Sequence, residues 1–256
     1  MQVGLIGCGN MARALARGWG RPVLCFDPVS ERARALASET EGEALASSTE
    51  VATAADLVVL CHKPAQLYDV AGEIASSAKA VASILAATPL EALRMAYPQT
   101  PVYRFLPSLP AEVRRGAMVQ AADPSRAAGG LHDANFDAEV AELFAELGTL
   151  VTVDESLVDV AMGLMSCAPA YVALVAEAQV DAGVRRGLPP AQASALVTET
   201  LAGTAELLRR RNYDTLAVRR EVASPGGITA RGLAALERGG IRAAFSDALD
   251  AVLGAR

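Results

Sequence analysis

The sequence predicts an α/β protein in which a doubly wound parallel sheet is followed by an all-helical domain. In the first 153 residues, short β-rich runs alternate with helical patterns, which is typical of a parallel sheet covered by helices on both faces. After residue 153, strand-like runs vanish and amphipathic helical segments follow. We therefore predict a sheet domain over residues 1–153 and a helical domain over residues 154–256.

Apolar and β-branched runs bounded by turn residues predict the strands. Residues 57–61 form a continuous apolar run, as expected for a strand that is buried on both faces. The predicted strands are 3–6, 23–26, 57–61, 81–85, 102–105, 117–120 and 150–153.

Helical periodicity and start signals predict the helices. In the first half we expect helices near 11–19 and 31–37. Thr88-Pro89-Leu90-Glu91 indicates a further helix start, with a capping box and proline at the first helical position. The second half predicts helices near 155–166, 169–186, 190–210, 213–222 and 229–253, the last broken at 239–240.

The helical half is apolar on more than one face. Leu196, Val197 and Leu201 lie on different sides of one predicted helix. A small helical domain has little interior in which to bury them, so we expect a partner subunit to cover them. This predicts a homodimer or a higher homo-oligomer.

Composition and charge exclude several classes of partner. The 256 residues carry a net charge of -6, so no global positive field is available for a nucleic acid. No apolar stretch approaches the roughly 18 uninterrupted residues that span a bilayer, and the N-terminus enters a strand directly. The 4 cysteines lack metal-ligand spacing and suit reduced thiols. We expect a cytoplasmic protein with no nucleic-acid, membrane or metal partner.

A glycine-rich motif follows the first predicted strand. Residues 7–12 fit G-x-G-x-x-G/A between a strand and a helix. Gly7 permits the tight turn, Gly9 lets the backbone approach a pyrophosphate, and Ala12 allows close packing of helix on strand. The motif predicts a Rossmann dinucleotide site, which includes Gly7, Cys8, Gly9, Asn10 and Met11.

Asp27 ends the second predicted strand, 20 residues after Gly7. A carboxylate there can accept hydrogen bonds from the ribose hydroxyls and would repel a 2′-phosphate. This favours NADH over NADPH, although Arg32 and Arg34 could weaken the preference. The alternative is that Asp27 only caps the entry to the helix after Pro28.

Few residues are available for acid–base chemistry. Lysine occurs only at positions 63 and 79 and histidine only at positions 62 and 132, so the helical domain has neither. This argues against an enzyme of the β-hydroxyacid dehydrogenase type, which uses a lysine from that domain. Reduction of a C=N bond is less demanding, because a protonated imine is already electrophilic and a hydroxyl can assist at nitrogen. We expect His132 to face solvent.

Ser224-Pro225-Gly226-Gly227-Ile228-Thr229 predicts a loop that opens a helix. Its backbone N–H groups are free to bind a carboxylate, and Ser224 and Thr229 add hydroxyl groups. The alternative is a simple turn between helices with Thr229 as the N-cap.

Over nearly its whole length the sequence resembles the pyrroline-5-carboxylate reductase family. The matching motifs are residues 4–11, Lys63-Pro64, Pro169-Ala170-Tyr171, the S-P-G-G-x-T signature at 224–229, and residues 241–244. The resemblance implies a Rossmann domain followed by a helical dimerisation domain, with the active site built between subunits. It also implies hydride transfer from NAD(P)H to the C=N bond of the cyclic imino acid Δ1-pyrroline-5-carboxylate, giving L-proline.

The resemblance also implies site residues. The substrate carboxylate is held by the loop of Ser224, Gly226, Gly227 and Ile228, and the hydroxyl near the ring nitrogen is that of Thr229. Lys63 and Pro64 match the family's cofactor-side motif. His62, just before them, could reach the nicotinamide or a cofactor phosphate, although a histidine at a strand end is often structural.

Two segments depart from the family pattern. The family's M-P-N-T-P appears as residues 106–110, with Ser108 and Leu109 in place of the asparagine and threonine. Its S-G-S-G/S-P-A-Y becomes residues 165–171, beginning with Met165. These changes keep open a reductase of another cyclic imine or carbonyl acid, and a non-catalytic NAD-sensing protein. Retention of Thr229 argues against the sensor.

Overall fold

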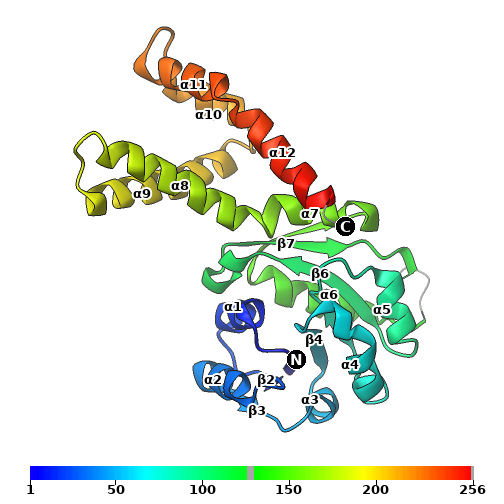
Figure 1. The fold of residues 1–256 in the computed structure, drawn as a ribbon. Helices are drawn as coiled ribbons and strands as arrows, with labels where there is room; N and C mark the ends of the chain where they lie inside the picture. The colour runs from blue at the N-terminus through cyan, green and yellow to red at the C-terminus, as the bar shows by residue number, and fades with distance from the viewer. Residues whose placement is uncertain (126–129, 255–256) are drawn as a thin grey trace. The chain divides into compact units, whose positions relative to one another are not determined.

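Eight strands form one sheet in the order β3-β2-β1-β4-β5-β6-β7-β8 in the computed structural model, which describes residues 1–125 and 130–254 (Figure 1). Neighbouring strands pair in parallel, except that β6 and β7 are antiparallel. The strands are β1 (Val3–Ile6), β2 (Leu24–Phe26), β3 (Glu43–Ala44), β4 (Leu57–Leu60), β5 (Val81–Ser83), β6 (Val102–Pro107), β7 (Gly116–Ala121) and β8 (Gly148–Val153).

Helices cover both faces of this sheet, which makes it doubly wound. One apolar cluster contains Trp19, Leu36 and Phe144, and the other contains Val51 and Leu93. Two layers of helices therefore enclose two cores. The helices are α1 (Asn10–Trp19), α2 (Ser30–Thr40), α3 (Ser48–Ala54), α4 (Leu67–Ile74), α5 (Leu90–Ala96), α6 (Ala134–Ala145) and α7 (Val158–Met165).

The chain divides into two compact units, Met1–Pro169 and Ala170–Arg256. All regular elements among the described residues of the second unit are helices. Its helices are α8 (Ala168–Val184), α9 (Pro190–Arg210), α10 (Thr215–Val222), α11 (Ile228–Arg238) and α12 (Ile241–Gly254). Because α7 packs in the sheet's second core through Val158, the first unit extends beyond β8. The predicted domain boundary after residue 153 stays a prediction.

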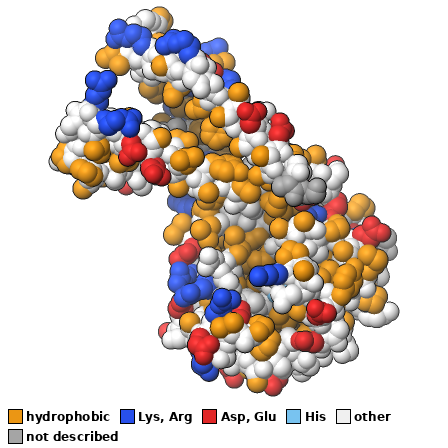
Figure 2. All heavy atoms as spheres, in the orientation of Figure 1, with side chains coloured by type: hydrophobic (Ala, Val, Ile, Leu, Met, Phe, Trp, Pro, Cys, Tyr) orange, Lys and Arg blue, Asp and Glu red, His pale blue; other side chains and the backbone are white. Residues whose placement is uncertain are grey.

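Large apolar side chains lie on the surface of the second unit. Leu174, Leu196 and Phe245 are exposed by 64%, 60% and 50% in the single chain. Figure 2 shows apolar side chains dispersed among polar ones over these helices. By length and composition alone, the helical span 155–184 would suffice to cross a membrane. That test is also passed by core helices of soluble proteins, and α7 ends at Met165 before α8 begins.

The predicted fold class, with its strands and its helices in the second half, is confirmed. The short edge strand β3 and the helices α3, α4 and α6 were not predicted. The predicted capping box at Thr88 is wrong. α5 begins at Leu90 with Pro89 as its N-cap, and the Thr88 hydroxyl donates back to the Ala86 carbonyl O at 3.1 Å. The Leu90 N–H instead donates to Glu155 Oε1 at 2.9 Å.

His132 does not face solvent, contrary to the expectation from its loop. Its Nδ1 lies 3.0 Å from Asp137 Oδ1, and its ring meets the Tyr103 ring edge to face with centroids 5.3 Å apart. The side chain is only 9% exposed. Because its ring packs against Tyr103 of β6 and contacts Asp137, the histidine has a structural role rather than a surface position.

A buried guanidinium joins three elements of the first unit. Arg104, on β6, donates from Nη1 to Glu155 Oε1 at 2.6 Å and from Nη2 to Asp159 Oδ1 at 3.3 Å. Its side chain is 3% exposed. Since Glu155 Oε1 also accepts the Leu90 N–H, this ion network connects β6 to the start of α5 and to α7.

We expect Arg104→Met to lower the free energy of unfolding by about 2–3 kcal/mol, because it leaves two partly buried carboxylates without this cation. Urea unfolding followed by circular dichroism measures the effect. Arg34→Met is the matched control, since its exposed pair with Glu31 is worth less than about 1 kcal/mol. Equal losses in the two variants would contradict a structural role for the buried network.

Candidate cofactor and substrate sites

Gly7 packs directly against the end of β4. It has a φ of +96°, and a Cβ placed on it would lie 2.8 Å from the Cys61 carbonyl and the His62 nitrogen. Its N–H donates to the Phe26 carbonyl O at 2.8 Å. Only glycine fits this position, both for its left-handed conformation and for its closeness to another backbone.

Gly9 faces open space instead. A Cβ placed on it would meet nothing within 4 Å, and the residue is the N-cap of α1. It lines a hollow of about 430 Å³ together with Gly7 and Asp27. The free N–H groups at the start of α1 therefore open onto a space where a pyrophosphate fits. Ala12, 1% exposed, lies in the core behind this loop.

Asp27 holds the glycine loop with both of its carboxylate oxygens. Oδ2 accepts the Cys8 N–H and Oδ1 accepts the Val29 N–H, each at 2.8 Å. The side chain lines the same hollow and the residue is 8% exposed. α2 itself begins at Ser30 with no side-chain cap, so Asp27 orders the turn before the helix and does not cap it directly.

Most of the predicted cofactor residues lie around two adjoining hollows. The larger one, termed the dinucleotide hollow, brings together five of them: Gly7, Gly9, Asp27, His62 and Lys63. Met11, His62 and Pro64 line the second hollow. Cys8 is buried, with Sγ 3.6 Å from the Phe26 carbonyl O, and Asn10 is exposed at the start of α1; neither lines a described hollow.

Charged side chains of both signs line the dinucleotide hollow. Its carboxylates are Asp27, Asp69 and Glu73, and its cations are Arg32 and Lys63. Negative charge therefore outnumbers positive charge on this wall.

The second hollow, of about 270 Å³, is largely apolar. We term it the apolar hollow. Its walls come from the carboxyl ends of β4, β5 and β6, where ligands of open α/β sheets bind. The lining residues are Met11, Cys61, His62, Pro64, Ile84, Leu85, Ala86, Leu106, Pro107, Met162 and Ser166. A flat, weakly polar ring such as a nicotinamide suits these walls.

His62 lies on the wall of both hollows. Its Nδ1 lies 2.9 Å from the Lys63 carbonyl O. Its Nε2 is buried and has no hydrogen-bond partner in the part of the chain that the structure describes. Burial lowers the pKa of His62, so the ring is neutral at pH 7.

The two segments that depart from the family pattern contribute differently to the apolar hollow. Ser108 is 2% exposed and its Oγ accepts the Ala117 N–H at 2.9 Å, so its hydroxyl is used within the β6–β7 connection. Leu106 and Pro107 line the hollow, whereas Leu109 is exposed. In the second segment Ser166 lines it, with its hydroxyl donating to the Pro107 carbonyl O at 2.8 Å.

Several wall residues of the apolar hollow were not predicted. Ile84 and Leu85, just after β5, and Met162, inside α7, are apolar residues that carry no motif. The available signal was the rule that ligands bind at the carboxyl ends of parallel strands, since Ile84 and Leu85 directly follow β5.

The loop from Ser224 to Thr229 opens helix α11. Gly226 has a φ of +70°, and the Gly227 N–H donates to the Ser224 carbonyl O at 3.0 Å. Gly227 is the N-cap, so Thr229 lies inside the first turn and the alternative that it caps the helix is wrong. Ile228 is 81% exposed. The first-turn N–H groups have no acceptor within the helix and open to solvent beside two hydroxyls, as a carboxylate site requires.

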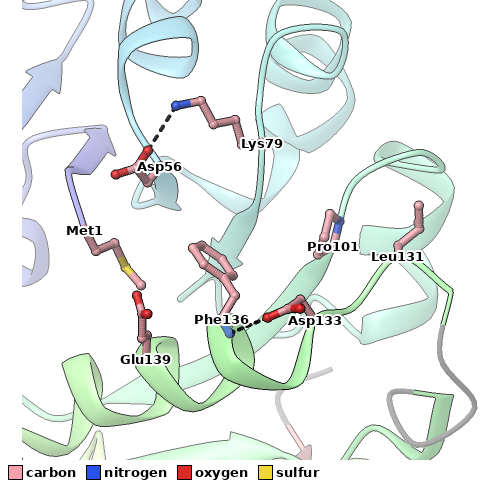
Figure 3. A pocket seen from close by; sticks show the side chains of 8 residues that line it. All are labelled: Met1, Asp56, Lys79, Pro101, Leu131, Asp133, Phe136 and Glu139. Carbon is pink, nitrogen blue, oxygen red and sulfur yellow. Dashed lines mark hydrogen bonds and ion pairs between the residues drawn. The ribbon is translucent and has the colours of Figure 1, made fainter.

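A third hollow, of about 520 Å³, lies at the opposite edge of the sheet (Figure 3). Met1, Asp56 and Lys79 each precede a parallel strand, so they mark the amino ends. Lys79 is paired there with Asp56 at 3.0 Å, and Asp133 caps α6. Because the glycine loop lies at the carboxyl ends, this hollow is separate from the cofactor site.

Comparison with known proteins identifies relatives over nearly the whole chain. Residues 155–255 match the family model "pyrroline-5-carboxylate reductase dimerisation", and residues 2–87 match "NADP oxidoreductase coenzyme F420-dependent". Pyrroline-5-carboxylate reductase 3 of Mus musculus is 34% identical, over 98% of this chain and 93% of its own length. The Thermus thermophilus reductase is 36% identical, over 98% and 95%.

Solved structures show the same fold. The pyrroline-5-carboxylate reductase of Streptococcus pyogenes superposes with a TM-score of 0.87 at 27% identity, covering 99% of this chain and 97% of that one. The Plasmodium falciparum enzyme, solved with NADP bound, has a TM-score of 0.85 at 25% identity, covering 98% and 95%.

Gly9→Ala should weaken NADH binding about tenfold or more, because the added methyl group points into the hollow where the pyrophosphate would lie. It should cost less than about 1 kcal/mol of stability, from the weaker N-cap alone. Calorimetric titration and thermal melting measure the two quantities. Gly7→Ala is the contrasting variant, which should lower the melting temperature strongly. Unchanged affinity in Gly9→Ala would place the cofactor elsewhere.

Proposed function

The chain belongs to the pyrroline-5-carboxylate reductase family, and we propose that it transfers hydride from NAD(P)H to C5 of Δ1-pyrroline-5-carboxylate, giving L-proline. The observation that carries this substrate assignment is the loop Ser224–Thr229, which presents free N–H groups and two hydroxyls at a helix start. A dinucleotide hollow would serve many reductases, whereas this loop suits a small acid with a reacting nitrogen nearby.

The cofactor, when bound, supplies the hydride, and the residues of the first unit hold it. The N–H groups at Gly9, Asn10 and Met11 would hold the pyrophosphate, because a helix start favours an anion. Gly7 and Cys8 shape that turn. Lys63, which lines the dinucleotide hollow, would offer a positive charge to the phosphates, and Pro64 would border the nicotinamide in the apolar hollow.

Residues of the loop hold and activate the substrate. The N–H groups of Gly226 and Ile228 and the Ser224 hydroxyl would bind the substrate carboxylate, and Gly227, whose N–H donates to the Ser224 carbonyl O, would hold the turn in place. The Thr229 hydroxyl would donate a hydrogen bond at the ring nitrogen. The imine must be protonated or hydrogen-bonded there for C5 to accept hydride readily, and the nitrogen becomes an amine as the C–H bond forms.

Asp27 favours NADH. Its carboxylate lies in the hollow with Asp69 and Glu73, and this excess of negative charge disfavours a 2′-phosphate. Its lone pairs remain available to ribose hydroxyls even though each oxygen accepts a backbone N–H.

We further propose that the enzyme is a cytoplasmic homodimer or a larger homo-oligomer. The dimerisation family matches residues 155–255, where Leu174, Leu196 and Phe245 are exposed in the single chain. The apolar span 155–184 begins in the same region. We assign its exposed side chains to contact between subunits and not to a membrane.

A steady-state assay tests the reaction. Purified protein with Δ1-pyrroline-5-carboxylate should oxidise NADH, followed at the nicotinamide absorbance, and light scattering should give at least twice the chain mass of 26.5 kDa. If the protein binds NADH but leaves this substrate unreduced, other cyclic imino acids become the candidates.

Thr229→Ala should lower kcat about 100-fold while NADH affinity stays unchanged, because only the group at the substrate nitrogen is lost. Thr229→Ser should recover much of the rate. Thr215→Ala is the matched control at the start of α10, and it should keep wild-type kinetics. An alanine variant at position 229 that is as active as wild type would remove this hydroxyl from the mechanism.

Asp27→Ser should raise the ratio of kcat/KM for NADPH to that for NADH by about tenfold or more, since it removes a negative charge from the ribose site. The rates with the two cofactors are measured on the same preparation. Any loss of folded protein lowers both rates equally and therefore cancels in their ratio. A ratio equal to that of wild type would mean that the carboxylate only holds the glycine loop.

A further inference from the structure

His62 presents an unmet hydrogen-bond acceptor where the two hollows adjoin. It follows β4 almost directly, and its side chain lines both the dinucleotide hollow and the apolar hollow. Gly7 and Gly9 place the pyrophosphate, and the apolar hollow suits the nicotinamide ring. A residue on the wall of both therefore lies beside the riboside that joins them.

The surroundings of the ring determine which nitrogen carries the proton. Nδ1 lies 2.9 Å from the Lys63 carbonyl O, and a carbonyl only accepts, so Nδ1 must be the donor. In the neutral ring Nε2 is then an acceptor. Burial lowers the pKa of His62 and so maintains this neutral form at pH 7.

Nothing in the described protein satisfies Nε2. The atom is buried and has no hydrogen-bond partner among the described residues. Ser166 carries the hydroxyl group among the lining residues of the apolar hollow, and that hydroxyl already donates to the Pro107 carbonyl O. A buried acceptor without a donor is unfavourable, and a ligand that brings a donor to this wall recovers that free energy.

We propose that His62 Nε2 accepts a hydrogen bond from the nicotinamide riboside half of the bound cofactor. That half carries two kinds of donor, the carboxamide N–H₂ and the ribose hydroxyls. Either contact would hold the riboside against the wall and orient the ring, which makes His62 a positioning residue for hydride delivery. The proposal rests on the proposed function only in requiring a nicotinamide dinucleotide.

Calorimetric binding without substrate tests the contact and needs no turnover. Three reduced cofactors are compared: NADH, the 3-acetylpyridine analogue, in which a methyl group replaces the carboxamide NH₂, and a deoxy analogue lacking both hydroxyls of the nicotinamide ribose. Wild type should bind NADH about fivefold or more tightly than one of the two analogues, the value of one hydrogen bond.

Variants of His62 then show whether the ring causes that preference. In His62→Leu the preference for NADH, which is the ratio of the analogue's Kd to the Kd of NADH, should fall to near one. In His62→Gln the side-chain oxygen reaches the region of Nε2 and should restore part of it, whereas His62→Asn is too short to do so. His132→Leu, which removes the other histidine, should keep the wild-type preference.

The outcomes separate the possibilities. Loss of preference against the acetylpyridine analogue identifies the carboxamide as the donor, and loss against the deoxy analogue identifies the hydroxyl. A leucine variant that keeps the wild-type preference against both overturns the contact. If that variant does not fold, equal preferences in His62→Gln and His62→Asn overturn it as well. Wild type that binds no NADH overturns the cofactor assignment itself, and the His62 contact with it.

Discussion

The approach of Gly7 to the end of β4 is the constraint on which the cofactor site depends. A Cβ at this position would overlap the Cys61 carbonyl, so the turn that follows the first strand can approach the residues that follow the fourth strand this closely only through glycine. This contact places Gly9 in front of the open hollow and sets His62 beside both hollows. The candidate anion site therefore depends first on close backbone packing at the ends of two strands. Charged side chains contribute only after that packing has shaped the site.

Local patterns were enough to predict most of the sheet but not all of its helices. The run at β4 is apolar without interruption because helices cover both of its faces, and such a run is visible in the sequence. α3 has a Ser47 cap that accepts the Glu50 N–H, but its seven residues show little periodicity. α5 was predicted to begin with a capping box, whereas its first N–H is accepted by Glu155, 65 residues away. A hydrogen-bond acceptor so far away in the sequence cannot be predicted from the few residues around the helix start.

The residues of the candidate site also fall into two groups, those that a local sequence pattern predicts and those that only tertiary contacts bring to the site. Gly7, Gly9 and Asp27 were predictable because each answers a local requirement of a strand–turn–helix unit. The hydrogen bond that the Ser108 hydroxyl accepts was not predictable. It depends on the antiparallel pairing of β6 with β7, which brings the Ala117 N–H close to this hydroxyl. Likewise, Met162 enters the apolar hollow only because α7 packs back onto the sheet. Residues that tertiary contacts recruit carry no motif of their own.

The two backbone contacts of Asp27 also bear on how cofactor use can evolve in this lineage. One carboxylate ties Cys8 to Val29 and also lines the dinucleotide hollow, so selection for a different cofactor would act on a residue that also shapes the loop. Exchange at this position therefore requires a compensating acceptor for the freed N–H groups.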